Sequence, residues 1–153
     1  FYDLMKTFGL LDNYIPLIVP TIAAPVVYFF MLQYMQGSLP LEIVEAARID
    51  GSNEFKTFNA IVLPIMKPAI AVQAIFAFVS NWNNYFTPNL IIRSQKLFTL
   101  PIVIAKLRAA DFTSFDNGKI YMAMVLSILP VVVVYLILSR YIIQGVAVGS
   151  VKG

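Results

Sequence analysis

The sequence contains few side chains that could perform catalysis or bind a metal, because it has no His and no Cys. Disulfides, thiolate or imidazole metal sites and histidine-based acid and base chemistry are therefore excluded. A phosphate-binding loop is also missing, since the one Gly-Lys pair, Gly118 and Lys119, is followed by Ile120 rather than by Ser or Thr. We expect no catalytic residue, no cofactor and no metal, and we predict that the chain is not an enzyme.

Neutral polar side chains within residues 68–92 are stronger candidates for a functional site. Gln73, Ser80 and Asn84 are spaced by seven and four residues, which places them in one stripe of an α-helix. Asn81 flanks this stripe, and Trp82 falls on the opposite face, where it should pack against another helix or anchor at the interface. Amides and hydroxyls are costly against lipid, so the stripe should face other helices or a wet passage. Two interpretations stay open: hydrogen bonds between helices, or a neutral wall suited to sugar hydroxyls.

A second group of residues combines small side chains with a fixed spacing in residues 37–67. A helix should follow Ser38 and run to about Asp50, where Gly51 stops it in a left-handed backbone conformation. Ser52 or Asn53 can then cap a second short helix. The sequence thus predicts a polar connector of two helices joined at a glycine. Its fixed residues are Glu45, Ala46, Ala47, then after three residues Gly51, and after nine more Ile61, followed by Leu63 and Pro64.

This connector resembles the EAA signature of the permease subunits of bacterial ABC importers, which reads E-A-A, three residues, G, nine residues, I, one residue, L, P. The match covers seven fixed residue types over twenty positions. It implies a coupling helix that docks on a cytoplasmic ATPase, with small alanines for close approach and Gly51 setting the angle between the helices. It also implies three kinds of partner: cytoplasmic ABC ATPase subunits, a second permease subunit and an extracytoplasmic solute-binding protein. The docking residues that it implies are Glu45, Ala46, Ala47, Asp50, Gly51, Ile61, Leu63 and Pro64.

Further features resemble the carbohydrate-uptake, maltose-permease-like branch of these proteins. They are Asp50 directly before Gly51, the run Trp82-Asn83-Asn84, and the pattern G-x-x-x-G-x-V-K-G at residues 145–153. The resemblance implies import of a sugar or oligosaccharide. The alternatives are a permease for another polar solute, such as an amino acid, phosphate or polyol phosphate, and a structural subunit of another membrane complex. Candidate residues for the substrate pathway are Gln73, Ser80, Asn81, Asn84 and Tyr28, although a lone Tyr in an aromatic-rich span is usually a packing residue.

The composition places these residues on membrane helices. Hydrophobic residues make up 59% of the chain and charged residues 12%, which is about half the charged share of a soluble domain. Three windows of 20 or more residues carry no charge, and each can cross about 30 Å of hydrocarbon as a helix. A large soluble core is the less favoured alternative, because so many uncharged windows occur in so short a chain. We predict an all-α membrane protein with three transmembrane helices, at about 14–36, 68–92 and 120–139.

The chain should form one partial permease domain, residues 1–153, equivalent to the C-terminal half of such a subunit, since it opens at Phe1 without an initiator Met or signal peptide. We expect an external loop at 93–119, while the connector and a tail at 140–153 would be cytoplasmic. The side with the connector and tail holds five Lys and Arg and the other side six, so charge does not orient the chain. The net charge of +3 comes without a basic run, which gives no support for nucleic-acid binding. We predict a multi-pass protein of the bacterial cytoplasmic (inner) membrane, in contact with lipid.

Overall fold

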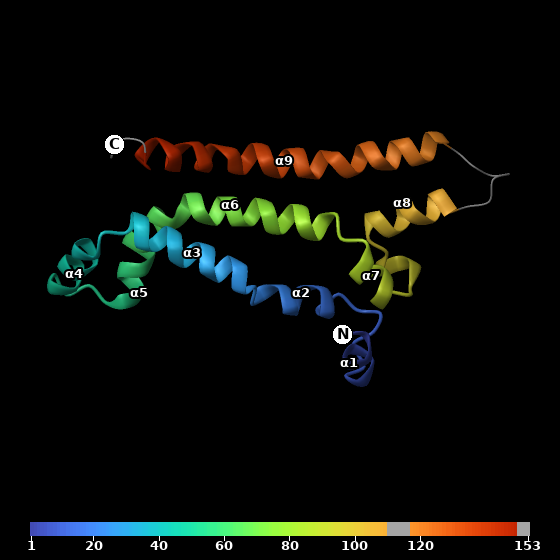
Figure 1. Cartoon of the computed structure of the whole chain (residues 1–153), viewed down its shortest axis with the longest axis horizontal. Helices are drawn as coiled ribbons and strands as arrows, with labels where there is room; N and C mark the ends of the chain where they lie inside the picture. Colours follow the sequence, from blue (N-terminus) through green and yellow to red (C-terminus); the bar gives the residue numbers. More distant parts are fainter. Residues whose placement is uncertain (110–116, 150–153) are drawn as a thin grey trace. The chain divides into compact units, whose positions relative to one another are not determined.

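The computed structural model describes the backbone of residues 1–109 and 117–149, and within those residues the secondary structure is entirely helical (Figure 1). Residues 110–116 of the predicted external loop and 150–153 of the predicted tail lie outside the described residues. The elements are α1 Tyr2–Thr7, α2 Ile15–Ile22, α3 Pro25–Ser38, α4 Leu41–Ile49, α5 Glu54–Thr57, the π-helical η1 Phe58–Val62, α6 Leu63–Trp82, α7 Phe86–Ile91, the 3₁₀ turn η2 Gln95–Leu97, α8 Leu100–Ala109 and α9 Asn117–Gly149.

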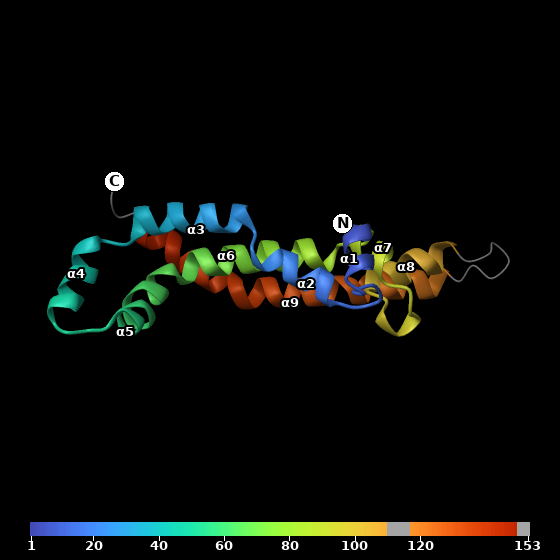
Figure 2. The same ribbon diagram turned by 90° about the horizontal axis from the view of Figure 1, so that it is seen from below.

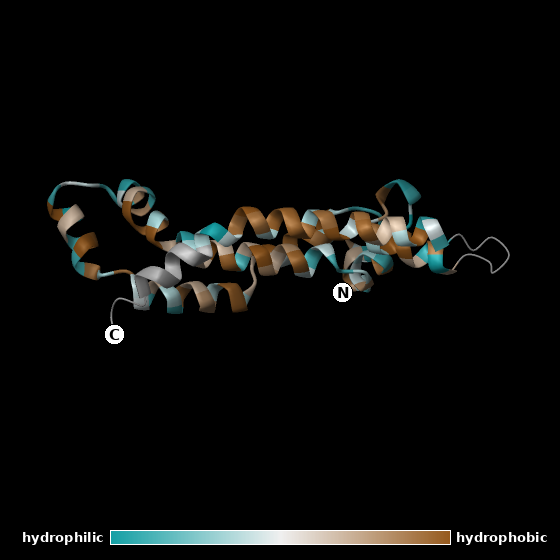
Figure 3. Cartoon of the chain, turned by 90° about the horizontal axis from the view of Figure 1, so that it is seen from above, coloured by the Kyte–Doolittle hydropathy of each residue, from teal (hydrophilic) through white to brown (hydrophobic). Residues whose placement is uncertain are grey.

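Three stretches are long and apolar enough to cross a membrane: Ile15–Ser38, Glu54–Trp82 and Asn117–Tyr141. Only 6%, 17% and 11% of their most apolar windows are buried within the described chain. The hydropathy colouring shows that hydrophobic residues predominate along these helices (Figure 3). Apolar surface of this extent is stable against lipid or against further helices. The predicted all-α fold with three membrane-spanning helices is confirmed.

The first span is interrupted where its prolines predict a kink. Pro16 is the second residue of α2 and is tolerated there, because a proline in the first turn loses no helical hydrogen bond. The helix stops at Ala23, whose φ of −106° and ψ of 64° lie outside the helical region. A new helix, α3, then starts at Pro25. Proline disfavours a helical conformation in the residue before it, which explains a break of two residues at this point.

The second and third spans differ from the predicted limits. The helix α6 ends at Trp82 rather than Ile92, because the amides of Asn81 and Asn83 donate back to the carbonyls of Ala77 and Val79, at 2.7 and 2.9 Å. Such local side-chain bonds compete with continuation of the helix. The helix α9 continues from Asn117 to Gly149, so the predicted tail is helical as far as it is described.

The chain divides into two compact units, which we describe separately. The first unit consists of Phe1–Ala24 and Ala77–Val134, and its most buried residues include Ile91, Ile102 and Ile120. The second unit consists of Pro25–Phe76 and Tyr135–Gly153. Its buried residues are small or flexible, namely Thr57, Met66, Ala69 and Ala71, which allow helices to approach closely.

Candidate coupling loop and solute cavity

The connector turns sharply at Gly51, whose φ of +79° confirms the predicted left-handed conformation. Beyond this residue, the amide of Ser52 donates to the carbonyl of Ala47 at 2.9 Å, while the amide of Gly51 donates to that of Arg48 at 3.0 Å. The last carbonyls of α4 are thereby satisfied, as at other glycine-terminated helices. Arg48 also binds Glu54 with two hydrogen bonds of 2.7 and 3.1 Å, and so joins α4 to the start of α5. Both side chains are more than half exposed, so solvent screens the pair and its contribution to stability is small.

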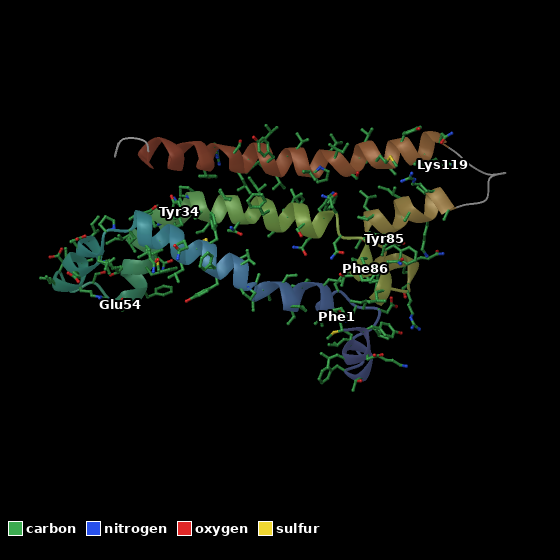
Figure 4. The ribbon with its side chains drawn as sticks, viewed as in Figure 1. Phe1, Tyr34, Glu54, Tyr85, Phe86 and Lys119 are labelled. Atoms are coloured by element: carbon green, nitrogen blue, oxygen red, sulfur yellow. The ribbon has the colours of Figure 1, made fainter. Side chains whose placement is uncertain are left out.

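The second helix of the connector begins with a cap that the sequence predicts. Asn53 accepts a hydrogen bond of 2.8 Å from the amide of Lys56. Thr57, only 2% exposed, donates its hydroxyl proton to the Ser52 hydroxyl at 3.0 Å. These two hydrogen bonds fix the turn between α4 and α5 in one conformation. Glu54, at the start of α5, is labelled in Figure 4. The connector is therefore a defined projection rather than a free loop.

A π-helical segment, Phe58–Val62, follows α5 and runs directly into α6. Ile61 lies in this segment, and Leu63 and Pro64 are the first two residues of α6. The predicted second connector helix is thus continuous with the following membrane helix. Figure 2 shows α5 leading into α6 without a break. The spacing of apolar residues could not reveal this, because a single π turn changes the hydrogen-bond register without a strong sequence signal.

The outer surface of the connector is exposed and partly apolar. Glu45 and Ala46 are exposed and Ala47 is half-buried, so the two alanines leave little side chain between the α4 backbone and an approaching surface. Ile49 is 86% exposed and Phe55 is 80% exposed. Large apolar side chains on a polar projection are typical of a protein contact. Chemically the loop offers shape and apolar area, with exposed carboxylates at Glu42, Glu45 and Asp50.

The first unit contains a cavity of about 750 Å³. Asn81 and Asn84, both predicted pathway residues, line it together. The other polar side chains of its lining are Tyr14, Thr21, Thr87 and Thr99. The remaining wall is apolar and includes Phe86, which is labelled in Figure 4. All of the lining side chains among the described residues are uncharged, so the cavity presents neutral hydrogen-bonding groups on an apolar wall.

Thr99 has a special position in this lining. Its hydroxyl oxygen is buried and has no hydrogen-bond partner among the described residues. A buried hydroxyl without a partner costs roughly 1–3 kcal/mol. Nearby, the Tyr14 hydroxyl donates to the carbonyl of Leu97 at 3.0 Å and joins the start of the first span to the segment before α8.

The polar stripe is only partly realised. The helix ends at Trp82, so Asn84 lies in the following turn, where its side-chain oxygen accepts from the Thr87 amide at 3.2 Å. Gln73, Ser80 and Tyr28 are absent from the lining of the cavity. Tyr28 is 71% exposed on α3. The predicted stripe assumed a helix that continues past Trp82. The helix ends there because of the side-chain hydrogen bonds of Asn81 and Asn83 described above.

Sequence reasoning missed Tyr14, Thr21, Thr87 and Thr99. They come from three segments, namely α2 with its N-cap, α7 and the residue before α8, so only the folded chain shows that they share a cavity.

Trp82 stacks on Phe78, with ring centroids 5.5 Å apart, and its indole N–H donates to the Ser127 carbonyl of α9 at 2.9 Å. It packs between helices in the first unit and is absent from the cavity lining. At the end of α6, Asn81 and Trp82 therefore lie on different faces of the helix, as the helical spacing predicts.

The comparison with known families concerns almost the whole chain. Residues 3–148 match the model of the binding-protein-dependent transport system inner membrane component. The chain belongs to this permease family. Its members are transport components rather than enzymes, and the family together with the three apolar helices makes the chain a multi-pass protein of the bacterial inner membrane.

Two permeases and one solved structure illustrate the similarity. The chain is 40% identical over 152 residues to the arabinooligosaccharides transport system permease protein AraQ of Halalkalibacterium halodurans, covering 99% of this chain and 53% of that protein. It is 32% identical to the lactose transport system permease protein LacG of Rhizobium radiobacter, covering 99% and 54%. A crystal structure of a bacterial ABC transporter that imports the acidic polysaccharide alginate matches with a TM-score of 0.76 and 25% identity, covering 92% of this chain and 54% of the other. The chain thus spans about half the length of the curated relatives it matches.

In this permease, Asp12 joins the segment before the first span to the segment after α7. Its carboxylate accepts hydrogen bonds from the amides of Arg93 and Ser94, at 2.9 and 2.8 Å, and from the Ser94 hydroxyl. The backbone amide of Asp12 donates to the carbonyl of Ile91 at 3.1 Å. The Ser94 hydroxyl and amide, followed by the Arg93 amide, hold the pKa of Asp12 below its ordinary value. The φ of Asp12 is +59°, a region that Asp and Asn tolerate better than most residues.

Proposed function

We propose that this permease forms part of the translocation pathway of an ATP-driven importer for a sugar or oligosaccharide. In the proposed assembly, ATP hydrolysis takes place in separate cytoplasmic ATPase subunits, and the EAA-type loop couples to them. A second permease subunit completes the pathway, and an extracytoplasmic solute-binding protein delivers the solute. The connector and the end of α9 then lie on the cytoplasmic side.

The single observation that carries the choice of solute is the neutral cavity with the unpartnered Thr99 hydroxyl. A sugar offers many hydroxyl donors and acceptors, which suit amide and hydroxyl side chains. A phosphate-bearing solute would instead favour Arg or Lys, and the described lining contains neither. The apolar wall suits the flat carbon face of a sugar ring.

The coupling half of the proposal is supported by the loop geometry. The left-handed Gly51, the Arg48–Glu54 pair and the buried Thr57 hold α4 and α5 in a fixed turn. A fixed turn can transmit a displacement of a docked partner, whereas a flexible one would absorb it. The exposed alanines of α4 let such a partner approach the helix closely.

The test uses the full-length protein with its partners in proteoliposomes and compares three variants. Thr99→Val removes the unpartnered hydroxyl without changing the shape of the side chain, and Asn81→Ala removes an amide of the cavity lining. Ser80→Ala is the matched control, since Ser80 is on the same helix as Asn81 but is absent from the lining. We expect sugar uptake to fall by roughly tenfold in the first two, as one lost hydrogen bond is worth about 1 kcal/mol or more, and to stay unchanged in the third.

The proposal would be overturned if Thr99→Val and Asn81→Ala transported sugar as well as Ser80→Ala does. Transport of a phosphate ester in preference to any sugar would also contradict the choice of solute. Thermal unfolding of the detergent-solubilised complex shows whether each variant is folded. Thr99→Val should be at least as stable as the parent, because it removes a buried group without a partner.

A further inference from the structure

A second, smaller groove lies within the second unit, between the start of α6 and the end of α9. Its volume is about 270 Å³. The two helices run side by side here in both views of the ribbon (Figures 1 and 2). Its lining residues are Lys67, Ile70, Ala71, Ala74, Leu138 and Tyr141. Lys67 is the last residue of the connector, and none of the six residues lines the solute cavity.

The groove carries positive charge at one end and is apolar along the rest. Lys67 is exposed and forms part of the lining. Arg140 donates a hydrogen bond of 2.9 Å to the Tyr141 hydroxyl, and its guanidinium carbon lies 4.8 Å from the centre of the Tyr141 ring. Tyr141 is itself a lining residue, so it holds the guanidinium beside the groove. Ala74 keeps the apolar part open because its side chain is small.

The two cations have no carboxylate partner among the residues that the structure describes. The ion pair found there joins Arg48 to Glu54 in the connector. Arg140 is the first charged residue after the third uncharged window, which ends at Ser139. Basic and aromatic side chains at the end of a membrane helix lie at the depth of the lipid head groups. An anion that fits this site therefore has its charge at the membrane surface.

We propose that the groove binds an anionic phospholipid, with the phosphate between Lys67 and Arg140 and part of one acyl chain along Ile70, Ala74 and Leu138. A soluble anion would use the two cations but would gain nothing from the apolar wall. A zwitterionic lipid would fill the wall but would bring a positive group to two cations. This inference depends on the membrane location of the permease and not on which solute it carries.

The experiment measures lipid retention on the full-length permease in its assembled complex by native mass spectrometry. The complex is exchanged into phosphatidylglycerol or phosphatidylcholine before measurement. Lys67→Gln combined with Arg140→Gln should weaken retention of phosphatidylglycerol by about 30-fold, because each basic residue near anionic lipid contributes a factor of roughly five. The matched control, Lys6→Gln with Lys96→Gln, removes the same charge from exposed positions in the first unit and should retain the lipid.

Two further variants separate the phosphate site from the apolar groove. Lys67→Arg with Arg140→Lys keeps both charges and should retain phosphatidylglycerol, which also shows that these positions tolerate substitution. Ala74→Trp keeps both cations but fills the groove, and should lower retention. Three results would each overturn the proposal. Ala74→Trp could retain phosphatidylglycerol as well as the parent does, or the control pair could lose as much of it as the Lys67→Gln, Arg140→Gln variant does. Glycerophosphoglycerol, which lacks acyl chains, could also compete as effectively as phosphatidylglycerol itself.

Discussion

The φ of +79° at Gly51 makes this residue the most sensitive point of the connector. A Cβ placed on Gly51 would find no heavy atom within 4 Å, so a substitution there creates no clash. Its cost comes from the backbone alone. A left-handed conformation costs an L-residue about 1–2 kcal/mol, and more for a β-branched one. We therefore expect Gly51→Val to destabilise the turn by about 2 kcal/mol.

A free-energy difference of about 1.4 kcal/mol changes a population ratio tenfold. The cost of the substitution therefore lowers the ratio of connectors with the native turn to connectors without it by about 30-fold. The Arg48–Glu54 pair is exposed and screened by solvent, so it is too weak to restore the turn. The membrane spans should still form, because Gly51 lies outside the three apolar stretches. The variant should be inserted in normal amount but poorly coupled.

The assay is sugar uptake and solute-stimulated ATP hydrolysis by the assembled importer, with insertion measured in the membrane fraction. Gly37→Val is the matched control, since a Cβ on Gly37 also meets no atom within 4 Å and its backbone is helical. Gly51→Asn should recover much of the activity, because Asn tolerates the left-handed region. If Gly51→Val supported uptake and ATPase association as well as Gly37→Val, the connector would not be the coupling element.

Three further outcomes are expected. Ala47→Trp should abolish ATPase association without affecting membrane insertion, because a large side chain on α4 keeps the docked surface away. Its association is measured by co-purification. Protonation of Asp12 should release the Ser94 amide: the pKa of Asp12 is lowered in the folded protein, so the contact persists at neutral pH and is lost only as pH falls through that lowered pKa. Protection of the Ser94 amide from hydrogen exchange, measured relative to its intrinsic rate at each pH, should fall only there, and should be low at all pH values in Asp12→Ala. Trp82→Phe should destabilise the complex by about 1 kcal/mol, because the Ser127 carbonyl loses its donor, which thermal unfolding measures.

Each of these outcomes has a result that would contradict it. Normal ATPase co-purification of Ala47→Trp would show that this face of α4 is not docked. Protection of the Ser94 amide that does not change with pH in the parent would mean that Asp12 does not hold the segment after α7. A stability of Trp82→Phe equal to that of the parent would mean that the indole hydrogen bond adds nothing beyond the packing on Phe78.

Local rules were sufficient for the turn of the connector at Gly51, for the cap at Asn53 and for the break in the first span. They were wrong for the start of α4, whose N-cap is Pro40 because Ser38 still belongs to α3. The conformation of Gly51 and the cap at Asn53 depend on a few adjacent residues, and the break before Pro25 depends on the proline ring alone. Each of these features is determined within about one helical turn. The three apolar stretches could be predicted for a related reason, since hydrocarbon thickness sets a length that is easily counted.

The solute cavity and the end of α6 could not be predicted in the same way. Thr99 meets the cavity because the segment before α8 is bonded to Tyr14, which is far away in the sequence. Asp12 and Ser94 are separated by 82 residues. The end of α6 depends on whether the side-chain amides of its asparagines donate hydrogen bonds to carbonyls of the same helix or to a neighbouring segment. Periodicity contains no information on that competition.

The neutrality of the cavity lining has an electrical consequence. A charge moved across the membrane exchanges about 2.3 kcal/mol with every 100 mV of potential. An uncharged solute that passes an uncharged wall exchanges none of this energy, so the potential neither assists nor opposes its passage through this part of the protein. Import through such a wall can therefore proceed at the same rate in a fully energised cell and in one whose membrane potential has collapsed, provided that ATP is still supplied.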